Sequence, residues 1–384
     1  MCGALKKIKV CCFCEQWESG GIESFLYNVL LHMDLSMMEV DLVAAQMEES
    51  VFTAPLKARG IQFYELSGRQ NRLPENYRLF RRLLAERKYD VVHLHIFHGL
   101  SLWYGNLAEQ AGVPIRIAHS HNTALRKSRT KPLKLLVHQA AKEAFADKAT
   151  DLWACSGQAA EFLFPRKILD RRGFRFIPNG IDTNRFRFNA ELRETVRDDL
   201  GIQDRYVIGH IGRLCYQKNQ GFLLDMLYEV LEGRPDGVLL LVGEGPDRSS
   251  LEEKARELGI ADNVIFYGTS DRVEHLLWAM DVFVFPSRFE GLGIVAVEAQ
   301  AAGLPVLCSE IIPQEADITG EIVRLPLSVG AKVWAEAVLK IKHLNRIPGA
   351  TRVAEAGFDI FAVAKKIRER WMRQGDDRNF TASF

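Results

Sequence analysis

Apolar residues along the chain follow two alternating patterns. Short apolar runs of strand length are followed by stretches in which apolar residues recur every three or four positions, as on one face of a helix. In the first half this predicts strands at 8–14, 40–44, 90–95 and 115–119, and helices at 22–32 and 77–87. Such alternation is typical of βαβ units in a parallel sheet, which binds ligands at the carboxyl ends of its strands.

The alternation stops at residues 177–182, where a polar stretch begins, and it restarts near residue 206. The second series comprises strands at 206–211, 238–242, 264–267, 282–285 and 306–308, and helices at 221–231, 249–258, 273–279 and 293–302. The sequence therefore predicts an α/β protein with two Rossmann-like, doubly wound parallel-sheet domains, at 1–190 and 191–360. Residues 361–384 are predicted to form a closing helix, which could cross back to the first domain, and a frayed tail.

The overall composition excludes several classes of protein. Of the 384 residues, 47% are hydrophobic and 26% charged, as in ordinary globular proteins. Fifty Lys and Arg residues nearly balance 49 Asp and Glu residues, so no global basic field favours nucleic acid. No apolar run approaches the roughly 18 residues that a membrane-spanning helix needs, and the first residues lack a signal-peptide layout. We therefore expect a cytoplasmic protein.

The seven cysteines are scattered, which fits a reducing compartment better than a disulfide framework. Cys11 and Cys14 form a C-x-x-C pair inside an apolar strand. No second pair completes a tetrahedral zinc site, and redox pairs of this kind stand where a helix begins. Burial in the first strand is the better interpretation of this pair.

Two carboxylates, Glu290 and Glu298, lie eight positions apart across a glycine turn that leads from a strand into a helix. Gly291 and Gly293 allow the backbone to approach a ligand, and the free N–H groups of the helix start favour an anion. Glu298 could accept hydrogen bonds from vicinal hydroxyls such as those of ribose. For either glutamate alone, a helix cap or a solvated residue is the better interpretation; the combination with the glycines favours a ligand site.

A second candidate segment follows the strand at 206–211, where Gly212 leads into a short loop that carries Arg213 and Lys218. Fixed cations can meet the charge that develops on a diphosphate leaving group without a metal ion. Alone, the two cations are better explained as exposed surface residues. A ligand-binding role for the two cations becomes the better interpretation because this loop and the glutamate pair are predicted at the same edge of one sheet.

These motifs together resemble the retaining GT-B glycosyltransferases of family four. The resemblance rests on Gly212-Arg213-Leu214 with Lys218-Asn219, Gly243-Glu244-Gly245-Pro246, the Glu290-x7-Glu298 segment, Asn179-Gly180-Ile181-Asp182 and Gly20-Gly21-Ile22-Glu23, and it runs from about residue 9 to 313. Residues 117–122 (IAHSHN) look most like exopolysaccharide and capsule glycosyltransferases. The resemblance implies two domains facing a cleft, and transfer of a hexose or N-acetylhexosamine with retention of configuration. The donor would be a nucleotide-diphosphate sugar, weighted towards UDP, and the acceptor a glycan or lipid-linked glycan.

The resemblance also implies a role for each matched position. Arg213 and Lys218 would hold the diphosphate, Glu298 the ribose, and Glu290 the transferred sugar. The backbone N–H groups of Leu292, Gly293 and Ile294 would lie near the phosphates, Gly20 and Gly21 would close over them, and the loop at Tyr267 would receive the base. No metal or other cofactor is expected, because the chemistry of this family needs none.

The family has a histidine that faces the sugar after a strand of the first domain, and this chain has two candidates, His119 and His121. We favour His121, because the strand is predicted to end near His119; the other is then a structural histidine. His93, His95 and His98 form another cluster, whose H-x-H spacing can bind metal. With no adjacent carboxylate or cysteine, we interpret these three as lining the acceptor cleft.

Residues 124–148 carry seven Lys and Arg against two acids, with apolar positions between them. Such a segment can rest on an anionic membrane surface, where lipid-linked acceptors lie, and a solvated basic helix is an equally good interpretation. The alternatives for the whole chain are a sugar-nucleotide epimerase or phosphorylase of the same fold, or a nucleotide-sugar-binding protein without catalysis. A dinucleotide oxidoreductase is disfavoured, because no G-x-G-x-x-G follows the first strand.

Overall fold

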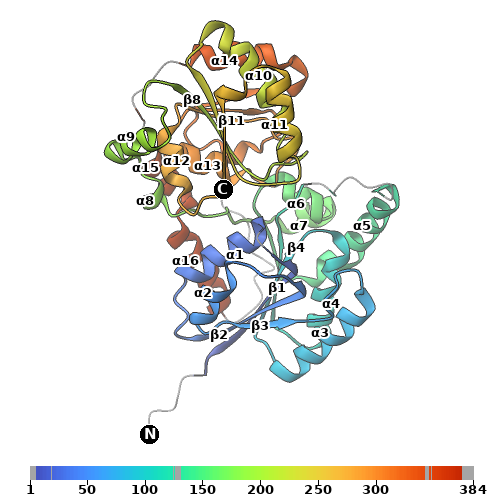
Figure 1. Cartoon of the computed structure of the whole chain (residues 1–384). Coiled ribbons are helices and arrows are strands. Elements are labelled where there is room, and N and C mark those ends of the chain that lie inside the picture. The colour runs from blue at the N-terminus through green and yellow to red at the C-terminus, as the bar shows by residue number, and fades with distance from the viewer. Residues whose placement is uncertain are drawn as a thin grey trace. The chain divides into compact units, whose positions relative to one another are not determined.

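The computed structural model describes residues 6–18, 20–123, 125, 131–341, 346 and 348–373. The chain divides into two compact units: the first unit is Met1–Gly180 with Ile360–Phe384, and the second unit is Ile181–Asp359. In each unit, helices flank a parallel sheet (Figure 1). The sequence placed the change of domain at residue 190, whereas the units meet at residues 180 and 181. The predicted frayed tail lies outside the described residues.

The first unit contains a parallel sheet of order β3-β2-β1-β4-β5-β6-β7. Its strands are β1 (Ile8–Trp17), β2 (Met38–Met47), β3 (Gln62–Glu65), β4 (Val91–Ile96), β5 (Ile115–Ser120), β6 (Asp151–Ala154) and β7 (Arg175–Phe176). Its helices are α1 (Gly21–His32), α2 (Thr53–Ala58), α3 (Leu73–Arg87), α4 (Leu102–Gln110), α5 (Lys131–Phe145), α6 (Gly157–Leu163), α7 (Arg166–Arg172) and α16 (Ile360–Met372). The order of the strands reverses between β1 and β4, where doubly wound sheets bind ligands.

The centre of this sheet is buried on both faces, which explains its nearly continuous hydrophobic strands. Cys11 and Cys14 are buried as free thiols in β1. They lie an odd number of positions apart and therefore point to opposite faces of the sheet. This confirms the interpretation of the C-x-x-C pair as part of a buried strand.

The closing helix α16 packs on the first unit, beside α1 (Figure 1). Its Arg370 is buried and makes a two-pronged ion pair with Asp151 of β6, with N–O distances of 2.6 and 2.8 Å. Lys366 of the same helix donates to the carbonyl oxygen of Phe176 in β7. The last helix is therefore an integral part of the unit in which the chain begins.

The second unit repeats the architecture of the first, with a parallel sheet of order β10-β9-β8-β11-β12-β13. Its strands are β8 (Tyr206–Ile211), β9 (Gly237–Val242), β10 (Val264–Gly268), β11 (Val282–Phe285), β12 (Val306–Ser309) and β13 (Ile322–Leu325). Its helices are α8 (Thr183–Phe186), α9 (Ala190–Asp199), α10 (Gln220–Gly233), α11 (Arg248–Glu257), α12 (Val273–Ala279), α13 (Ile294–Ala301), α14 (Ala331–Lys340) and α15 (Gly349–Val353). Here the strand order reverses between β8 and β11.

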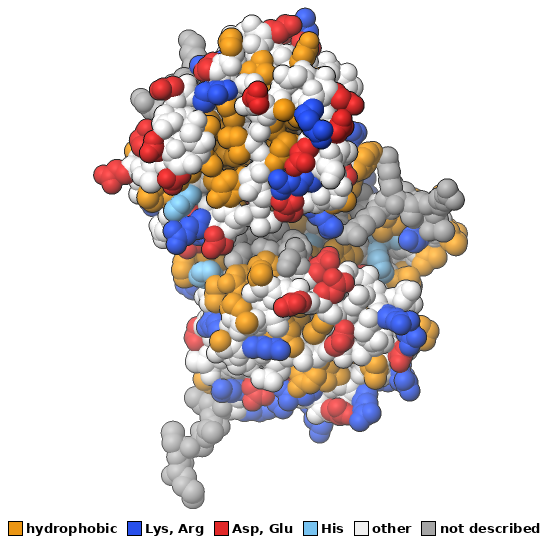
Figure 2. All heavy atoms as spheres, viewed as in Figure 1, with side chains coloured by type: hydrophobic (Ala, Val, Ile, Leu, Met, Phe, Trp, Pro, Cys, Tyr) orange, Lys and Arg blue, Asp and Glu red, His pale blue; other side chains and the backbone are white. Residues whose placement is uncertain are grey.

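The predicted α/β fold of two doubly wound domains is confirmed by these two sheets. Among the helices that the structure describes, none combines the length and the apolar character needed to cross a bilayer. On the face shown in Figure 2, acidic and basic side chains are interspersed rather than gathered by sign, as the balanced composition predicts.

Candidate functional site

Two loops meet at the carboxyl edge of the second sheet, one after β8 and one after β11. The Lys218 ammonium lies 2.6 Å from a carboxylate oxygen of Glu290 and 5.0 Å from the centre of the Phe285 ring. Both charged side chains are largely buried, with exposed fractions of 17% and 9%. The structure thus brings together two residues that lie 72 positions apart in the sequence. They meet where the strand order reverses.

The residues beside this ion pair fasten the same two loops together. Asn219 donates to the carbonyl oxygen of Pro286 and accepts a hydrogen bond from the Arg288 guanidinium. The side-chain amide of Gln217 donates to the backbone carbonyl oxygen of Phe289. The backbone N–H of Arg288 donates to the backbone carbonyl oxygen of Gln217. Asn219 adopts a left-handed conformation, with φ of 60°, which asparagine tolerates better than most residues. Asn219 of the Lys218-Asn219 motif therefore has a structural role, because it holds the two loops together.

The helix α13 begins directly after this junction. Its first turn follows Gly293, which has φ of 84° and would carry a Cβ only 2.9 Å from the Phe285 ring. No side chain caps this end of the helix, which begins four residues after Glu290. A helix start of this kind favours an anionic group.

Glu298 lies further along α13 and is partly buried. Burial raises the pKa of Glu298 to about 7; the positive charges of Arg185 and Lys218 oppose this rise, and the negative charge of Glu274 adds to it. Lys218 therefore pairs with Glu290, and its charge also opposes the rise in the pKa of Glu298. Arg213 shares the loop of Lys218, but its side chain is exposed, and the structure does not bring it into the pair.

Arg185 and Glu274 are members of this cluster that the sequence interpretation missed. The Arg185 guanidinium of α8 lies 2.7 Å from the carboxylate of Glu274, which is buried at the start of α12. Asp182 caps the start of α8, because its side chain accepts hydrogen bonds from the backbone N–H groups of Asn184 and Arg185. The signal for this contact was the matched motif that ends at Asp182, to which no role had been given.

Two further loops complete the carboxyl edge of the second sheet. Gly243 donates a backbone hydrogen bond to the carbonyl oxygen of Gly268 at the end of β10, and Glu244 accepts one from the N–H of Leu214. A Cβ on Gly245 would lie 2.2 Å from the carbonyl oxygen of Leu214, which explains glycine at this position. Tyr267 precedes Gly268 and is 41% exposed. The loop after β9 is thus hydrogen-bonded on one side to the predicted base-binding rim and on the other to the loop that carries Arg213 and Lys218.

In the first unit, Gly20 and Gly21 join β1 to α1. A Cβ on Gly20 would lie 2.5 Å from a carboxylate oxygen of Glu23, whereas Gly21 has open space around it. Glu23 is buried in the first turn of α1, and this burial raises its pKa to about 7 against the effect of backbone hydrogen bonds from Gly20 and Glu23 itself. The glycine loop is therefore tightly packed on one side and exposed on the other.

Four histidines gather at the carboxyl ends of β4 and β5. His93 and His95 come from β4, His119 from β5, and His121 follows β5 directly. All four are buried, and burial lowers the pKa of each, that of His121 to about 3. The sequence grouped His98 with His93 and His95; instead, its ring nitrogen lies 3.2 Å from the carboxylate of Glu15.

His121 lies at the rim of this cluster and retains 7% exposure, whereas His119 has none. The Nδ1 atom of His95 lies 3.0 Å from Nε2 of His121 and can hold its ring in place. Phe25 of α1 packs against the rings of both His119 and His121. Which of the two faces a sugar stays a prediction.

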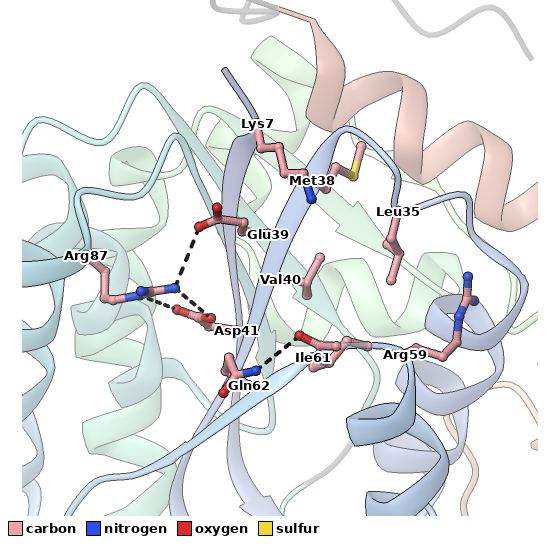
Figure 3. Close-up of a pocket in the computed structure, with 11 residues that line it drawn as sticks. Lys7, Leu35, Met38, Glu39, Val40, Asp41, Arg59, Ile61, Gln62 and Arg87 are labelled. Carbon is pink, nitrogen blue, oxygen red and sulfur yellow. Dashed lines mark hydrogen bonds and ion pairs between the residues drawn. The ribbon is translucent and has the colours of Figure 1, made fainter. Parts of the chain in front are cut away.

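A pocket of about 290 Å³ lies at the opposite, amino-terminal edge of the first sheet (Figure 3). Its most prominent polar contact is the two-pronged pair of Arg87 with buried Asp41. Arg59 lines it too, but donates to the carbonyl oxygens of Leu30 in α1 and of Met33 directly after this helix. Since these charged groups already have partners and doubly wound sheets bind ligands at the other edge, we assign this pocket no catalytic role.

Two models of known protein families match this chain, one in each half. The family model described as "Glycosyl transferase 4-like domain" matches residues 20–180, and that described as "Glycosyl transferases group 1" matches residues 193–351. A protein of Bacillus subtilis (strain 168), named as glycosyltransferase EpsF, is 34% identical over 336 residues, which are 85% of this chain and 86% of that protein.

Two further relatives carry more specific names. The Escherichia coli UDP-Gal:alpha-D-GlcNAc-diphosphoundecaprenol alpha-1,3-galactosyltransferase is 30% identical over 60% of each chain. The crystal structure of Anabaena HepE in complex with UDP has the same fold, with a TM-score of 0.76 at 20% identity over 94% of this chain and 99% of that one. On the fold, the two matched domains and the likeness to EpsF over most of its length, the chain belongs to the GT-B glycosyltransferases of family four.

Proposed function

We propose that the chain transfers a hexose or N-acetylhexosamine from a UDP-linked sugar to a glycan or lipid-linked acceptor in surface polysaccharide biosynthesis, with retention of configuration. The observation that carries this proposal is the buried pair of Lys218 and Glu290 beside the start of α13. A diphosphate at this edge would meet a fixed cation and the helix N–H groups, which stabilise the leaving group as its charge grows. Glu290 is then released to accept hydrogen bonds from the sugar.

The relatives support the choice of donor and acceptor. The galactosyltransferase of Escherichia coli names UDP-Gal as its donor and a diphosphoundecaprenol-linked sugar as its acceptor, and HepE of Anabaena holds UDP. In our proposal Glu298 accepts the ribose hydroxyls and Tyr267 borders the base. Retention follows from the resemblance to family four, and the proton of the acceptor hydroxyl leaves with the departing phosphate.

The test is a donor screen that measures nucleoside-diphosphate release with and without an acceptor. We expect release from one UDP-sugar that rises when a lipid-diphosphate-linked acceptor is added, and an α-linked product from an α-linked donor by NMR. Conversion of the sugar nucleotide without release would instead establish an epimerase. Binding of the donor without turnover under any acceptor would establish a binding protein.

The proposed transfer needs no divalent ion, because Lys218 and the helix start supply the positive field. We therefore expect full initial rates in excess EDTA with a metal-free donor. A rate that disappears with EDTA and returns with Mg²⁺ or Mn²⁺ would contradict this part of the proposal.

We also propose that α5 rests on an anionic membrane surface, which would bring the first unit to a lipid-linked acceptor. Four apolar side chains of this helix are exposed, those of Leu133, Leu135, Leu136 and Val137, and the predicted basic segment includes it. Exposed apolar residues flanked by lysines are typical of interfacial helices. Part of the basic segment, residues 124 and 126–130, lies outside the described residues.

The measurement is co-sedimentation with vesicles. The protein should bind vesicles that contain phosphatidylglycerol. It should not bind vesicles that consist only of phosphatidylcholine. The double variant Leu133→Ser/Leu136→Ser should lose most of this binding, whereas Val51→Ser, which alters another exposed apolar residue, should keep it. Equal binding by both variants would contradict a role for α5.

A further inference from the structure

The histidine cluster of the first unit has an arrangement that the proposed transfer reaction does not require. His93 and His95 alternate along β4 and therefore share a face of the sheet. In the register of β4 with β5, His95 lies directly opposite His119, so that residue shares the face as well. His121 follows two positions later. Imidazole groups from two neighbouring strands are thus held side by side by the backbone.

The distances within the cluster match those between ligands of one ion. The Nε2 atom of His93 lies 3.2 Å from Nδ1 of His119, and one ring nitrogen from each of His93, His95 and His119 lies within 4.8 Å of the others. Two imidazole nitrogens bound to one tetrahedral zinc ion, at about 2.0–2.1 Å each, are separated by roughly 3.4 Å. The widest of these separations, up to 4.8 Å, would have to close by roughly 1.4 Å through rotation of the rings to form three metal bonds.

The hydrogen bonds of the cluster leave nitrogen atoms unsatisfied. His93, His95, His119 and His121 each have one buried ring nitrogen without a partner among the described residues. A neutral imidazole has one donor and one acceptor, so two hydrogen-bonded pairs cannot satisfy all eight nitrogens. A buried unsatisfied polar atom costs about 1–3 kcal/mol, and the hydrogen bonds of this cluster reach only half of its ring nitrogens.

The surroundings of the cluster indicate which class of metal ion it would bind. The rings of Phe25, Trp153 and Trp371 enclose the cluster, and Cys12 and Cys14 of β1 stand beside His93 and His95 in register. Neutral imidazole ligands suit Zn²⁺, Co²⁺, Ni²⁺ and Cu²⁺, whereas Mg²⁺ and Ca²⁺ prefer oxygen.

We propose that His93, His95 and His119 form a binding site for one divalent transition-metal ion, with His121 at its rim. Three neutral ligands leave the ion with a double positive charge, which favours water, hydroxide or another anion in the fourth position. The ion is not a participant in the proposed sugar transfer. The bound ion would immobilise His119 and disturb the contact between His95 and His121. Binding of the ion should therefore slow sugar transfer rather than support it.

The experiment uses the full chain without an oligohistidine tag, stripped of metal with a chelator. Addition of Co²⁺ should give one equivalent of bound ion with the visible absorption of a tetrahedral site, and Zn²⁺ should displace it. A large excess of Mg²⁺ should not. Because these readouts need no donor or acceptor, they are independent of whether the proposed transfer is correct.

Matched variants locate the site. His93→Gln and His95→Gln should each weaken Co²⁺ binding by at least about tenfold, because the loss of a partner that only orients a ligand already costs about 10–100-fold. His32→Gln changes a histidine of the same unit that bonds within α1 and should bind Co²⁺ as the unaltered chain does. Circular dichroism identifies any variant that fails to fold. The absence of stoichiometric binding by the folded chain, or undiminished binding by both cluster variants, would overturn the proposal.

Discussion

At the scale of single residues, the pair of Lys218 and Glu290 is the feature on which the proposed chemistry depends. Lys218→Ala or Glu290→Ala should each lower the rate of transfer by more than about 100-fold, because a fixed charge at the leaving group or the sugar is lost. The measurement is the initial rate of nucleoside-diphosphate release with acceptor present.

Two exposed residues of α14 serve as controls for this prediction. Lys332→Ala and Glu336→Ala remove the same charges from the surface of the same unit and should leave the rate within about twofold, as surface substitutions generally do. Normal rates in both site variants would contradict the assignment of the site.

Glu298 provides a prediction of pH dependence. Its pKa rises from 4.5 to about 7 in the folded protein, so between these values the folded chain holds a proton that the unfolded chain releases. The free energy of unfolding therefore decreases as the pH rises through this window. Glu298→Gln removes the ionisation, and its gain in melting temperature over the unaltered chain should be large at about pH 8 and vanish towards about pH 4.5. A gain that stays constant with pH would contradict the raised pKa.

Part of the candidate site could be predicted from local sequence and part could not. Glu290 and Lys218 stand in short motifs next to strand ends, and parallel strands bring their carboxyl ends to one edge. The contact of Arg185 with Glu274 depends on how α8 packs against α12, which no local pattern records. The four-histidine cluster was missed for the same reason, because the register of β4 with β5 decides which residues of two separate H-x-H segments meet.

At the scale of elements, the loop after β9 depends on a glycine. Gly245→Ala would place a methyl group 2.2 Å from the carbonyl oxygen of Leu214, and the loop of Arg213 and Lys218 would have to move. We expect a loss of about 1–3 kcal/mol in the stability of the second unit and weaker binding of UDP, measured by urea unfolding and calorimetry.

Gly221→Ala is the matched substitution for this test. Gly221 lies in the first turn of α10, and its nearest atoms would lie 3.8 Å or more from a new Cβ. Alanine should leave the stability unchanged or raise it by up to about 1 kcal/mol. Equal losses from both substitutions would show that the close approach at Gly245 is not the cause.

Elements with a strong periodic pattern were predicted to within a few residues, and the strands β8 and β11 and the helix α12 have the predicted bounds. Short elements without a clear pattern were missed, including β3, β7 and β13. Such strands lie towards the edges of the two sheets, where fewer apolar residues are needed and the alternation of buried and exposed positions is weak.

At the scale of the whole molecule, the buried pair of Arg370 with Asp151 fastens the end of the chain to the first unit. Arg370→Met should lower the free energy of unfolding of this unit by about 3–5 kcal/mol, because it leaves a buried carboxylate without its ion pair. The double variant Arg370→Met/Asp151→Leu should recover most of that loss. Urea denaturation followed by circular dichroism measures both, and an unrecovered loss in the double variant would contradict this account.

The return of α16 to the first unit has a consequence for how the protein is made. The second unit is an uninterrupted stretch of sequence, while the first is split by it, so the first unit cannot finish folding until residues 360–373 have been synthesised. An expression plasmid that stops at residue 180 or 190 would therefore yield the first unit without α16, with the apolar surface of β1 and α1 that this helix covers left open. A faithful version of that half needs residues 360–373 rejoined to it by a short linker.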